Sequence, residues 1–250
     1  MRPHLLFFTA LCGATLACAT LTPKPTIEWE PAGDQVVLEY NCFGGLVPTG
    51  YYDNAIAPVR LWGDGRLVWL EYAGSGRRVL EARLSPDEMR SLLTRVVDAG
   101  FFGWPQEIES TTVIYDGSDC SLGVSLKAEQ KDVWVRAGAE PPVAFVDLVD
   151  WLVAGAGASG EDVVPERGWL SAIPAGSNAD AVAAYVWPAD GIDGVRLAEA
   201  AQSVAVEGEA LTTAWDIVNA NRFALVESDG MLYTLVVQVQ GVTDRWPGSP

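Results

Sequence analysis

The chain contains a single histidine, His4, which lies in a segment that we expect to be removed. Residues 1–19 are typical of an export signal, because Arg2 precedes an apolar run, 5–17, that is too short to span a bilayer comfortably. Without this segment the body has no imidazole. Ser-His-Asp and Cys-His catalysis are then excluded, together with the commonest transition-metal ligand.

Sequence motifs typical of other catalytic or phosphate-binding sites are also absent. The sequence has no HExxH zinc motif, no GxSxG nucleophile elbow and no Gly-rich phosphate loop. We therefore predict a protein that is not an enzyme, with no cofactor and no metal site.

Positive charge is scarce. The chain has 16 Lys and Arg against 33 Asp and Glu, a formal net charge of -17. Loss of Arg2 with the signal leaves 15 minus 33, or -18. Such an acidic surface repels nucleic acid and anionic lipid headgroups, so neither is an expected partner.

Only four cysteines are present, and none forms a CxxC pair. Cys12 and Cys18 lie in the signal, whereas Cys42 and Cys120 lie in the body. Two body cysteines in an exported protein are most simply joined to each other, so we predict a Cys42–Cys120 disulfide.

The end of the signal has two interpretations. Thr15-Leu16-Ala17-Cys18 resembles the lipobox of bacterial lipoproteins, in which the cysteine is acylated, and 17–19 also fits the small-x-small pattern of ordinary cleavage. The polar, proline-containing segment 20–26 suits a tether. We favour a membrane-anchored extracytoplasmic lipoprotein with lipidation at Cys18, and the alternative is a secreted protein.

Hydrophobic periodicity predicts an α+β fold, with an antiparallel sheet that carries two helices on one face over residues 27–154. The clearest helix begins with a Ser85-Pro86-x-Glu88 capping box and ends at Gly100, and a second starts near 141–142. The predicted strands are 35–40, 59–62, 66–70, 78–84, 111–115, 122–126 and 132–136.

Residues 155–180 are predicted to be a linker, because 155–160 is a Gly-Ala-Ser segment typical of a flexible boundary. A smaller second α+β unit is expected over residues 181–250. Its predicted elements are a strand at 182–187, a helix at 208–220 and a hairpin of 223–227 with 231–239.

The order of features in the first domain resembles small bacterial domains of the emfourin type. A strand runs into Gly44-Gly45, an Asp-Gly hairpin and the helix at 84–102 follow, and Tyr115-Asp116-Gly117 precedes a Pro-led helix. The resemblance covers residues 35–153. Those domains are similar in outline to protein inhibitors of thermolysin-like metalloproteases, which implies an inhibitory contact through Phe43, Gly44 and Gly45. Where that family has an arginine-containing segment before the loop, this chain has Asn41-Cys42. The second unit looks like uncharacterised secreted bacterial proteins.

The best candidate binding segment is the loop from Asn41 to Asn54. Binding residues concentrate on loops held by a rigid sheet, and paired tyrosines give contact area at low entropic cost. The candidate residues are Phe43, Gly44, Gly45, Tyr51 and Tyr52.

Two other site classes stay open. Acidic clusters, among them Asp116 with Asp119 and Asp190 with Asp193, provide the carboxylate pairs that a glycosidase needs. Neither of these two pairs has the ligand spacing of an EF-hand calcium loop. Ten tryptophans are present, and a row of them on an exposed sheet face would suit sugars or proline-rich peptides. Strand alternation alone does not choose the face.

We predict a non-catalytic module of the cell envelope that binds another protein or a peptide. A metalloprotease inhibitor is the first alternative, and a carboxylate-based hydrolase such as a glycosidase is the second.

Overall fold

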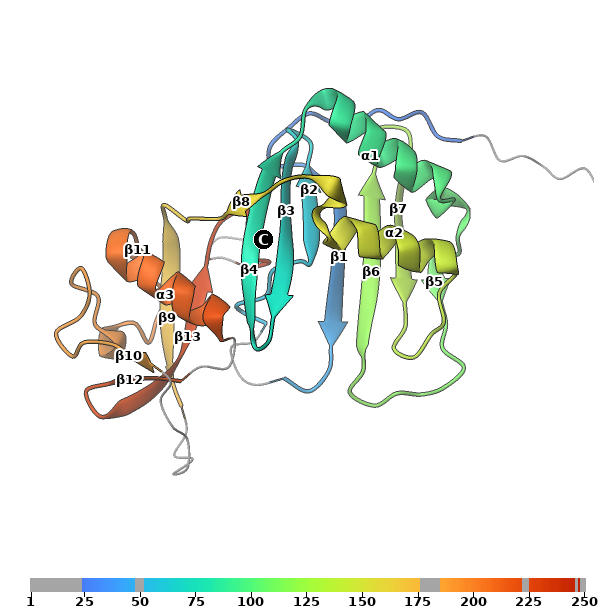
Figure 1. Ribbon diagram of the computed structural model, residues 1–250. Helices are drawn as coiled ribbons and strands as arrows, with labels where there is room; N and C mark the ends of the chain where they lie inside the picture. Colours follow the sequence, from blue (N-terminus) through green and yellow to red (C-terminus); the bar gives the residue numbers. More distant parts are fainter. Residues whose placement is uncertain (1–23, 48–51, 176–184, 222–224, 246, 248–250) are drawn as a thin grey trace, which may run out of the picture.

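The computed structural model describes residues 24–47, 52–175, 185–221, 225–245 and 247. They form an α+β structure with two sheets, as expected (Figure 1). The large sheet has eight strands in the order β5-β7-β6-β1-β2-β3-β4-β8, and the small sheet has five in the order β10-β12-β13-β9-β11. Each sheet is antiparallel except for one short parallel pair, β5 with β7 and β10 with β12.

The bounds of the strands in the large sheet are β1 Val36–Gly44, β2 Val59–Trp62, β3 Arg66–Ala73, β4 Gly76–Arg83, β5 Glu107–Ile108, β6 Ser118–Ser125, β7 Gln130–Val135 and β8 Glu161–Asp162. Those of the small sheet are β9 Gly168–Pro174, β10 Tyr185–Val186, β11 Val204–Val206, β12 Leu225–Ser228 and β13 Met231–Gln238. The helices are α1 Pro86–Asp98, α2 Val143–Val153 and α3 Gly208–Ala220, with short 3₁₀ turns η1 Phe101–Gly103, η2 Gly155–Gly157 and η3 Leu197–Glu199.

Helix α1 begins where its capping box predicts. The Glu88 backbone N–H donates to Ser85 Oγ at 3.3 Å, and the Ser85 N–H donates to the Glu88 carboxylate at 2.8 Å. These two bonds satisfy backbone donors that a helix start otherwise leaves open. Gly100 stops the helix with a φ of 92°, a conformation that suits glycine.

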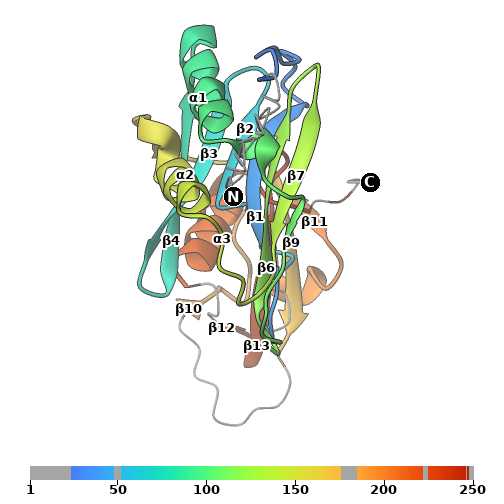
Figure 2. The ribbon, with the colours of Figure 1, turned by 90° about the vertical axis from the view of Figure 1, so that its right-hand side faces the viewer.

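Helices α1 and α2 cover the same face of the large sheet (Figure 2). Their apolar sides, including Leu93 and Leu152, pack on the side chains that β1, β2, β3 and β6 direct to that face. The predicted arrangement of two helices on one face is therefore confirmed. None of the helices in the described ranges has the length and apolarity needed to cross a membrane.

The second unit covers the opposite face of β2, β3 and β4. Trp62, Leu70 and Val79 on that face belong to one core cluster with Trp215 and Val218 of α3 and with the apolar side chains of the small sheet. In Figure 1 the second unit accordingly lies beside β4, with α3 next to that strand.

Polar groups lock the two units together. Arg60 is buried, and its guanidinium binds Glu39 of β1 and, at 2.7 Å, Asp244 near the end of the chain. The Asn54 side chain inserts into the small sheet: its Nδ2 donates to Leu235 O at 2.8 Å, and its Oδ1 accepts from Val237 N–H at 2.7 Å. A side-chain amide thus satisfies one donor and one acceptor of β13, as a neighbouring strand would.

Three local expectations differ from the structure. Residues 41–44, expected in a loop, continue β1 because they pair with β6 as far as Gly44 and Ser118. Residues 111–115, expected as a strand, form none and are exposed, because their β-forming composition finds no neighbouring strand. The expected linker contains β8 and also β9, which lies between β13 and β11 in the small sheet; the domain boundary itself stays a prediction.

Gly155 and Gly160 have a packing role. They allow the backbone to approach the Trp69 ring, because a Cβ at Gly155 would lie 2.6 Å from that ring and one at Gly160 would lie 2.1 Å from it. Two glycines of this glycine-rich segment therefore permit the close contact of a backbone with a large side chain.

Gly160→Ala is expected to destabilise the protein by about 1–3 kcal/mol, because the new methyl group overlaps the buried Trp69 ring. Gly103→Ala is the control, since a Cβ there meets no atom within 4 Å. Urea unfolding monitored by circular dichroism measures both free energies. Equal stability of the two variants would contradict the packing role.

Candidate binding surface at the end of the large sheet

A disulfide joins the two strands that carry the candidate loop. Cys42 of β1 and Cys120 of β6 lie directly opposite each other in the antiparallel register and are bonded, with a Cα–Cα distance of 4.0 Å. This is the predicted pair. It closes a separation of 78 residues and fixes β1 against β6 two residues before β1 ends.

Gly44 and Gly45 lie where two loops touch. Their φ values are 99° and 88°, which side chains rarely adopt. A Cβ on Gly44 would lie 3.1 Å from Gly117 O, and one on Gly45 would lie 3.2 Å from Asp116 O. These glycines therefore let the segment after β1 contact the loop before β6 through backbone atoms.

Tyr52 holds this turn. Its hydroxyl donates to the carbonyl of Gly44 at 2.6 Å, and the Ser118 hydroxyl donates to the same carbonyl at 3.1 Å. The structure thus brings Gly44, Gly45 and Tyr52 together as a scaffold for the turn. Tyr51, the other candidate tyrosine, and Cys18, the candidate lipidation site, lie outside the described residues.

Large apolar side chains are exposed around this scaffold. Leu46 and Tyr115 are each 87% exposed. Leu46 follows Gly45 and Tyr115 precedes Asp116, and these two neighbours are in contact. We name these residues the loop-end surface: Phe43, Leu46, Val113, Ile114 and Tyr115.

Sequence reasoning found only Phe43 of this set. Residues 113–115 were missed because their composition predicted a strand with buried positions. The Asp116-Gly117 pair, a turn signal in which Asp116 adopts a φ of 61°, was the available indication that a loop precedes β6.

An ion-pair network fixes the base of the loop before β6. The carboxylate of Asp119 accepts from the Ala137 backbone N–H and from Arg136, each at 2.8 Å, and Arg136 also binds Glu107. The bond from the Ala137 N–H, followed by the Arg136 guanidinium, holds the pKa of Asp119 below its ordinary value.

One member of each acidic pair singled out as a possible catalytic group has structural partners. Asp119 takes part in the network above, and the Asp193 carboxylate accepts from the backbone N–H groups of Glu209 and Ala210 at the start of α3. The described residues contain no group of three or more His, Cys, Asp or Glu side chains that would hold a metal ion. These contacts favour helix capping and ion pairing over catalysis.

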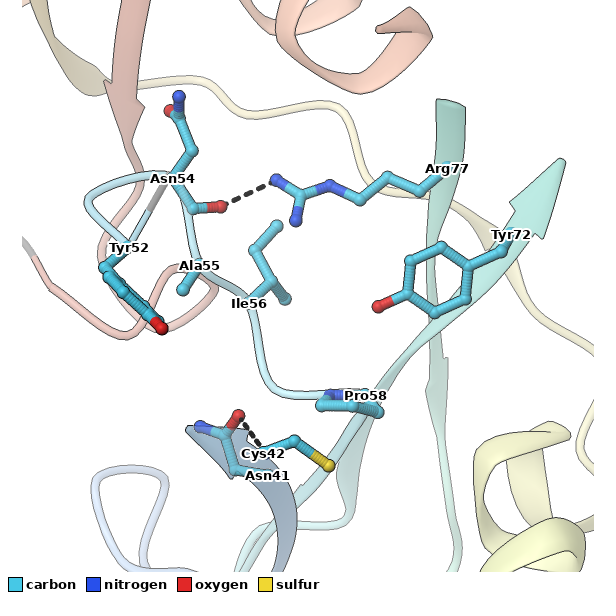
Figure 3. A pocket seen from close by; sticks show the side chains of 9 residues that line it. All are labelled: Asn41, Cys42, Tyr52, Asn54, Ala55, Ile56, Pro58, Tyr72 and Arg77. Carbon is cyan, nitrogen blue, oxygen red and sulfur yellow. Dashed lines mark hydrogen bonds between the residues drawn. The ribbon is translucent and has the colours of Figure 1, made fainter. Parts of the chain in front are cut away.

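A small cavity lies among the end of β1, the segment 52–58 and the hairpin of β3 and β4 (Figure 3). Tyr52 and Asn54 lie on one side of it, and Tyr72 and Arg77 lie on the other. Its volume is about 90 Å³, whereas pockets for small ligands usually measure about 300–1,000 Å³. The cavity is therefore a packing gap rather than a site for a metabolite.

The double variant Cys42→Ser/Cys120→Ser is expected to lose about 4 kcal/mol of stability, because the unfolded chain regains the entropy of a loop closed over 78 residues. Urea unfolding of the variant and of the wild type, each with and without reductant, measures the loss. The unfolding free energy of the variant should not change with reductant. Identical unfolding midpoints for oxidised wild type and variant would contradict the role of the disulfide.

Asp119→Asn is expected to destabilise the protein at neutral pH and to matter less in acid. A lowered folded-state pKa means that the stabilisation is complete above the unfolded-state pKa, about 3.9 for Asp, and disappears as the pH falls through the folded-state value. Unfolding free energies from pH 7 down to pH 2 test this. Asp147→Asn, at an exposed position of α2, is the control, and parallel pH curves for the two variants would refute the prediction.

Comparison with protein-family models gives no match. Comparison with curated protein sequences gives none either. The function of this chain is therefore argued from its own residues.

Proposed function

We propose that this protein is a non-catalytic binding module that holds another protein or a peptide through the loop-end surface. The observation that carries the proposal is the exposure of Leu46 and Tyr115 on a backbone that is fixed from several sides. Exposed apolar side chains that cluster at one place are a common mark of a protein interaction site. A fixed backbone lowers the entropic cost of binding.

The frame of this surface is unusually constrained for a loop. The disulfide joins its two strands, and the Tyr52 and Ser118 hydroxyls bind the carbonyl of Gly44. The Ile114 side chain packs against the backbone of Gly117 and Gly138. A Cβ added to Gly138 would lie only 2.5 Å from Ile114 Cδ1. Leu46 and Tyr115 consequently extend from positions that need little ordering when a partner binds.

We place the protein outside the cytoplasm. The described residues contain no helix that would span a membrane, and a Cys42–Cys120 disulfide is typical of oxidising compartments. Attachment to a membrane would then occur through acylation of Cys18, with segment 20–26 as the tether. Mass spectrometry of the mature amino terminus distinguishes this lipoprotein from a secreted form.

Inhibition of a metalloprotease is the second candidate function. The observation that favours it is the fixed Phe43-Gly44-Gly45 segment, since protease inhibitors bind with little change in their interface backbone. Under this second candidate function, the partner is a thermolysin-like enzyme and Phe43 is the contact residue.

Photo-crosslinking from positions 46 and 115 tests the proposed surface in intact cells. We expect both positions to capture the same protein or peptide, and the double variant Leu46→Asp/Tyr115→Asp to reduce its retention at least tenfold, since a buried anchor contributes about 1.4 kcal/mol or more. Position 186 is the control, because Val186 is also apolar and is 73% exposed, but lies in the small sheet.

Equal crosslinking from position 186, or none from 46 and 115, would reject the loop-end surface. Assays of the purified protein against a panel of thermolysin-like proteases separate the two functions. Inhibition that is lost in Phe43→Ala identifies the inhibitor, and inactivity across the panel removes that candidate.

A further inference from the structure

Strands β6 and β7 have a face that no described element covers. On these strands Leu122, Val124 and Val133 point to the helices and are buried, so their neighbours point to the opposite face. The second unit and the segment around Asp244 cover that opposite face over β2, β3, β4 and part of β1, where Asn41 is buried and bonds with Asp244. The face that β6 and β7 present there lies beyond this cover, and we name it the open face.

The register places three rows of residues across β1 and the open face of β6 and β7. Phe43 lies opposite Asp119, Asn41 opposite Ser121 and Trp134, and Glu39 opposite Gly123 and Asp132. The residues of β6 in these rows are short, whereas Trp134 and Asp132 extend from β7. A Cβ on Gly123 would lie 2.5 Å from the Asp132 carboxylate, so this carboxylate leans over the glycine on the sheet.

A hollow of about 580 Å³ lies around Trp134 at the β7 side of this face. Its size falls within the range of small-ligand sites. The lining combines one indole ring with two primary amides, two carboxylates and two cations: Gln106, Glu107, Gln130, Lys131, Asp132, Trp134 and Arg136.

Half of the polar groups in this hollow are already engaged. Lys131 donates to the carbonyl of Phe102 at 2.8 Å and to that of Trp104, and Arg136 binds Glu107 and Asp119. The side chains of Gln106, Gln130 and Asp132 make no such bond with any other described residue. Three exposed side chains able to form hydrogen bonds thus surround a partly buried ring and are accessible to a ligand.

The Trp134 ring is held in place. Its centroid lies 6.2 Å from that of the Phe43 ring, and the Arg136 guanidinium lies 5.8 Å from it. Both contacts come from the same end of the sheet, because Phe43 lies opposite Asp119 and Arg136 binds Asp119. A positioned aromatic ring beside free amides offers a stacking surface with hydrogen-bonding groups at its edge.

The cations that line the hollow are already paired. Arg136 binds Glu107 and Asp119, and the Lys131 ammonium binds the carbonyls of Phe102 and Trp104. No described cation pairs with Asp132, and the chain has a net charge of -17, so an anionic ligand would be repelled. An aromatic ring beside two amides and a carboxylate offers stacking and hydrogen bonding, which suits an uncharged ligand rich in hydroxyl groups.

We infer that the open face around Trp134 is a binding site for a neutral carbohydrate chain. One apolar face of a pyranose stacks on the Trp134 ring. The hydroxyl groups at the edge of the sugar donate to the Asp132 carboxylate, and they donate to or accept from the side-chain amides of Gln106 and Gln130. This site is separate from the proposed protein contact, although Phe43 borders both.

Isothermal calorimetry and tryptophan fluorescence with soluble oligosaccharides test the site. The panel comprises β-1,4-glucan, β-1,4-xylan, α-1,4-glucan and N-acetylglucosamine oligomers of four to six units. We expect at least one to bind with a change in indole fluorescence. Trp134→Ala should abolish this binding, and Asp132→Ala and Gln130→Ala should each weaken it about tenfold, a typical effect of losing a hydrogen bond at a site.

Two controls keep the outcome specific. Glu129→Ala, at an exposed position beside β7 but outside the hollow, should bind sugar as the wild type does. Leu46→Asp/Tyr115→Asp should also keep sugar binding, which separates this site from the loop-end surface. Gln130 is exposed, so its variant reports on the site even if Trp134→Ala fails to fold.

Failure of every oligomer in the panel to bind the wild type would overturn the assignment. So would binding that persists unchanged in Asp132→Ala and Gln130→Ala. Photo-crosslinking from position 130 that captures a peptide, and that sugar does not block, would assign the open face to a different class of ligand.

Discussion

Strands β2, β3 and β4 are apolar on both faces, and the rest of the structure depends on how these faces are covered. Alternate side chains such as Leu67 and Trp69 pack under α1 and α2, while Val68 and Leu70 pack against the second unit. Both coverings remove apolar surface from water, which is the largest favourable contribution to folding. The second unit is therefore part of one folded body with the large sheet.

The same pattern explains where the covering stops. On β6 and β7 the set that faces the helices includes Leu122, Val124 and Val133, whereas the other set contains Ser121, Gly123 and Asp132 beside a single large ring, Trp134. Such a face gains little by burial, so the open face stays available for ligands. Both proposed sites lie on this side of the molecule, one on the open face and one at the adjoining end of the strands.

The junction between the units is specified by buried polar groups. Burial opposes the charge of Arg60, but Glu39 and Asp244 outweigh that effect and raise the pKa of its guanidinium. Loss of one partner would leave a buried charge without compensation, a costly state. Asn54 acts similarly, because its amide matches the donor and acceptor on β13. The observed docking of the units satisfies these groups together.

Local signals predicted much of this fold. The capping box at Ser85, the Asp-Gly hairpin after Trp62 and the pairing of Cys42 with Cys120 depend on neighbouring residues or on a small choice of partners, and all are confirmed. The extension of β1 to Gly44 and the packing of Gly160 on Trp69 depend on distant segments. Single-sequence patterns contain no measure of such contacts.

The candidate site was predictable to the same extent. Gly44, Gly45 and Tyr52 were selected as binding residues from their types, and the structure gives them a supporting role because the loop before β6 lies against them. The open face was beyond prediction, because alternation separates the two faces of Trp134's strand without saying which one the helices cover.

The insertion of Asn54 into the small sheet has a kinetic consequence. It bonds to β13 residues 181 and 183 positions further along the chain, and Asn41 bonds to Asp244 across 203 positions. Such contacts join segments far apart in the chain, and closing very long loops slows folding. Until residues 235–244 join the fold, the second apolar face of β2, β3 and β4 stays exposed to water. The folding chain consequently passes through a stage in which an uncovered sheet face favours aggregation.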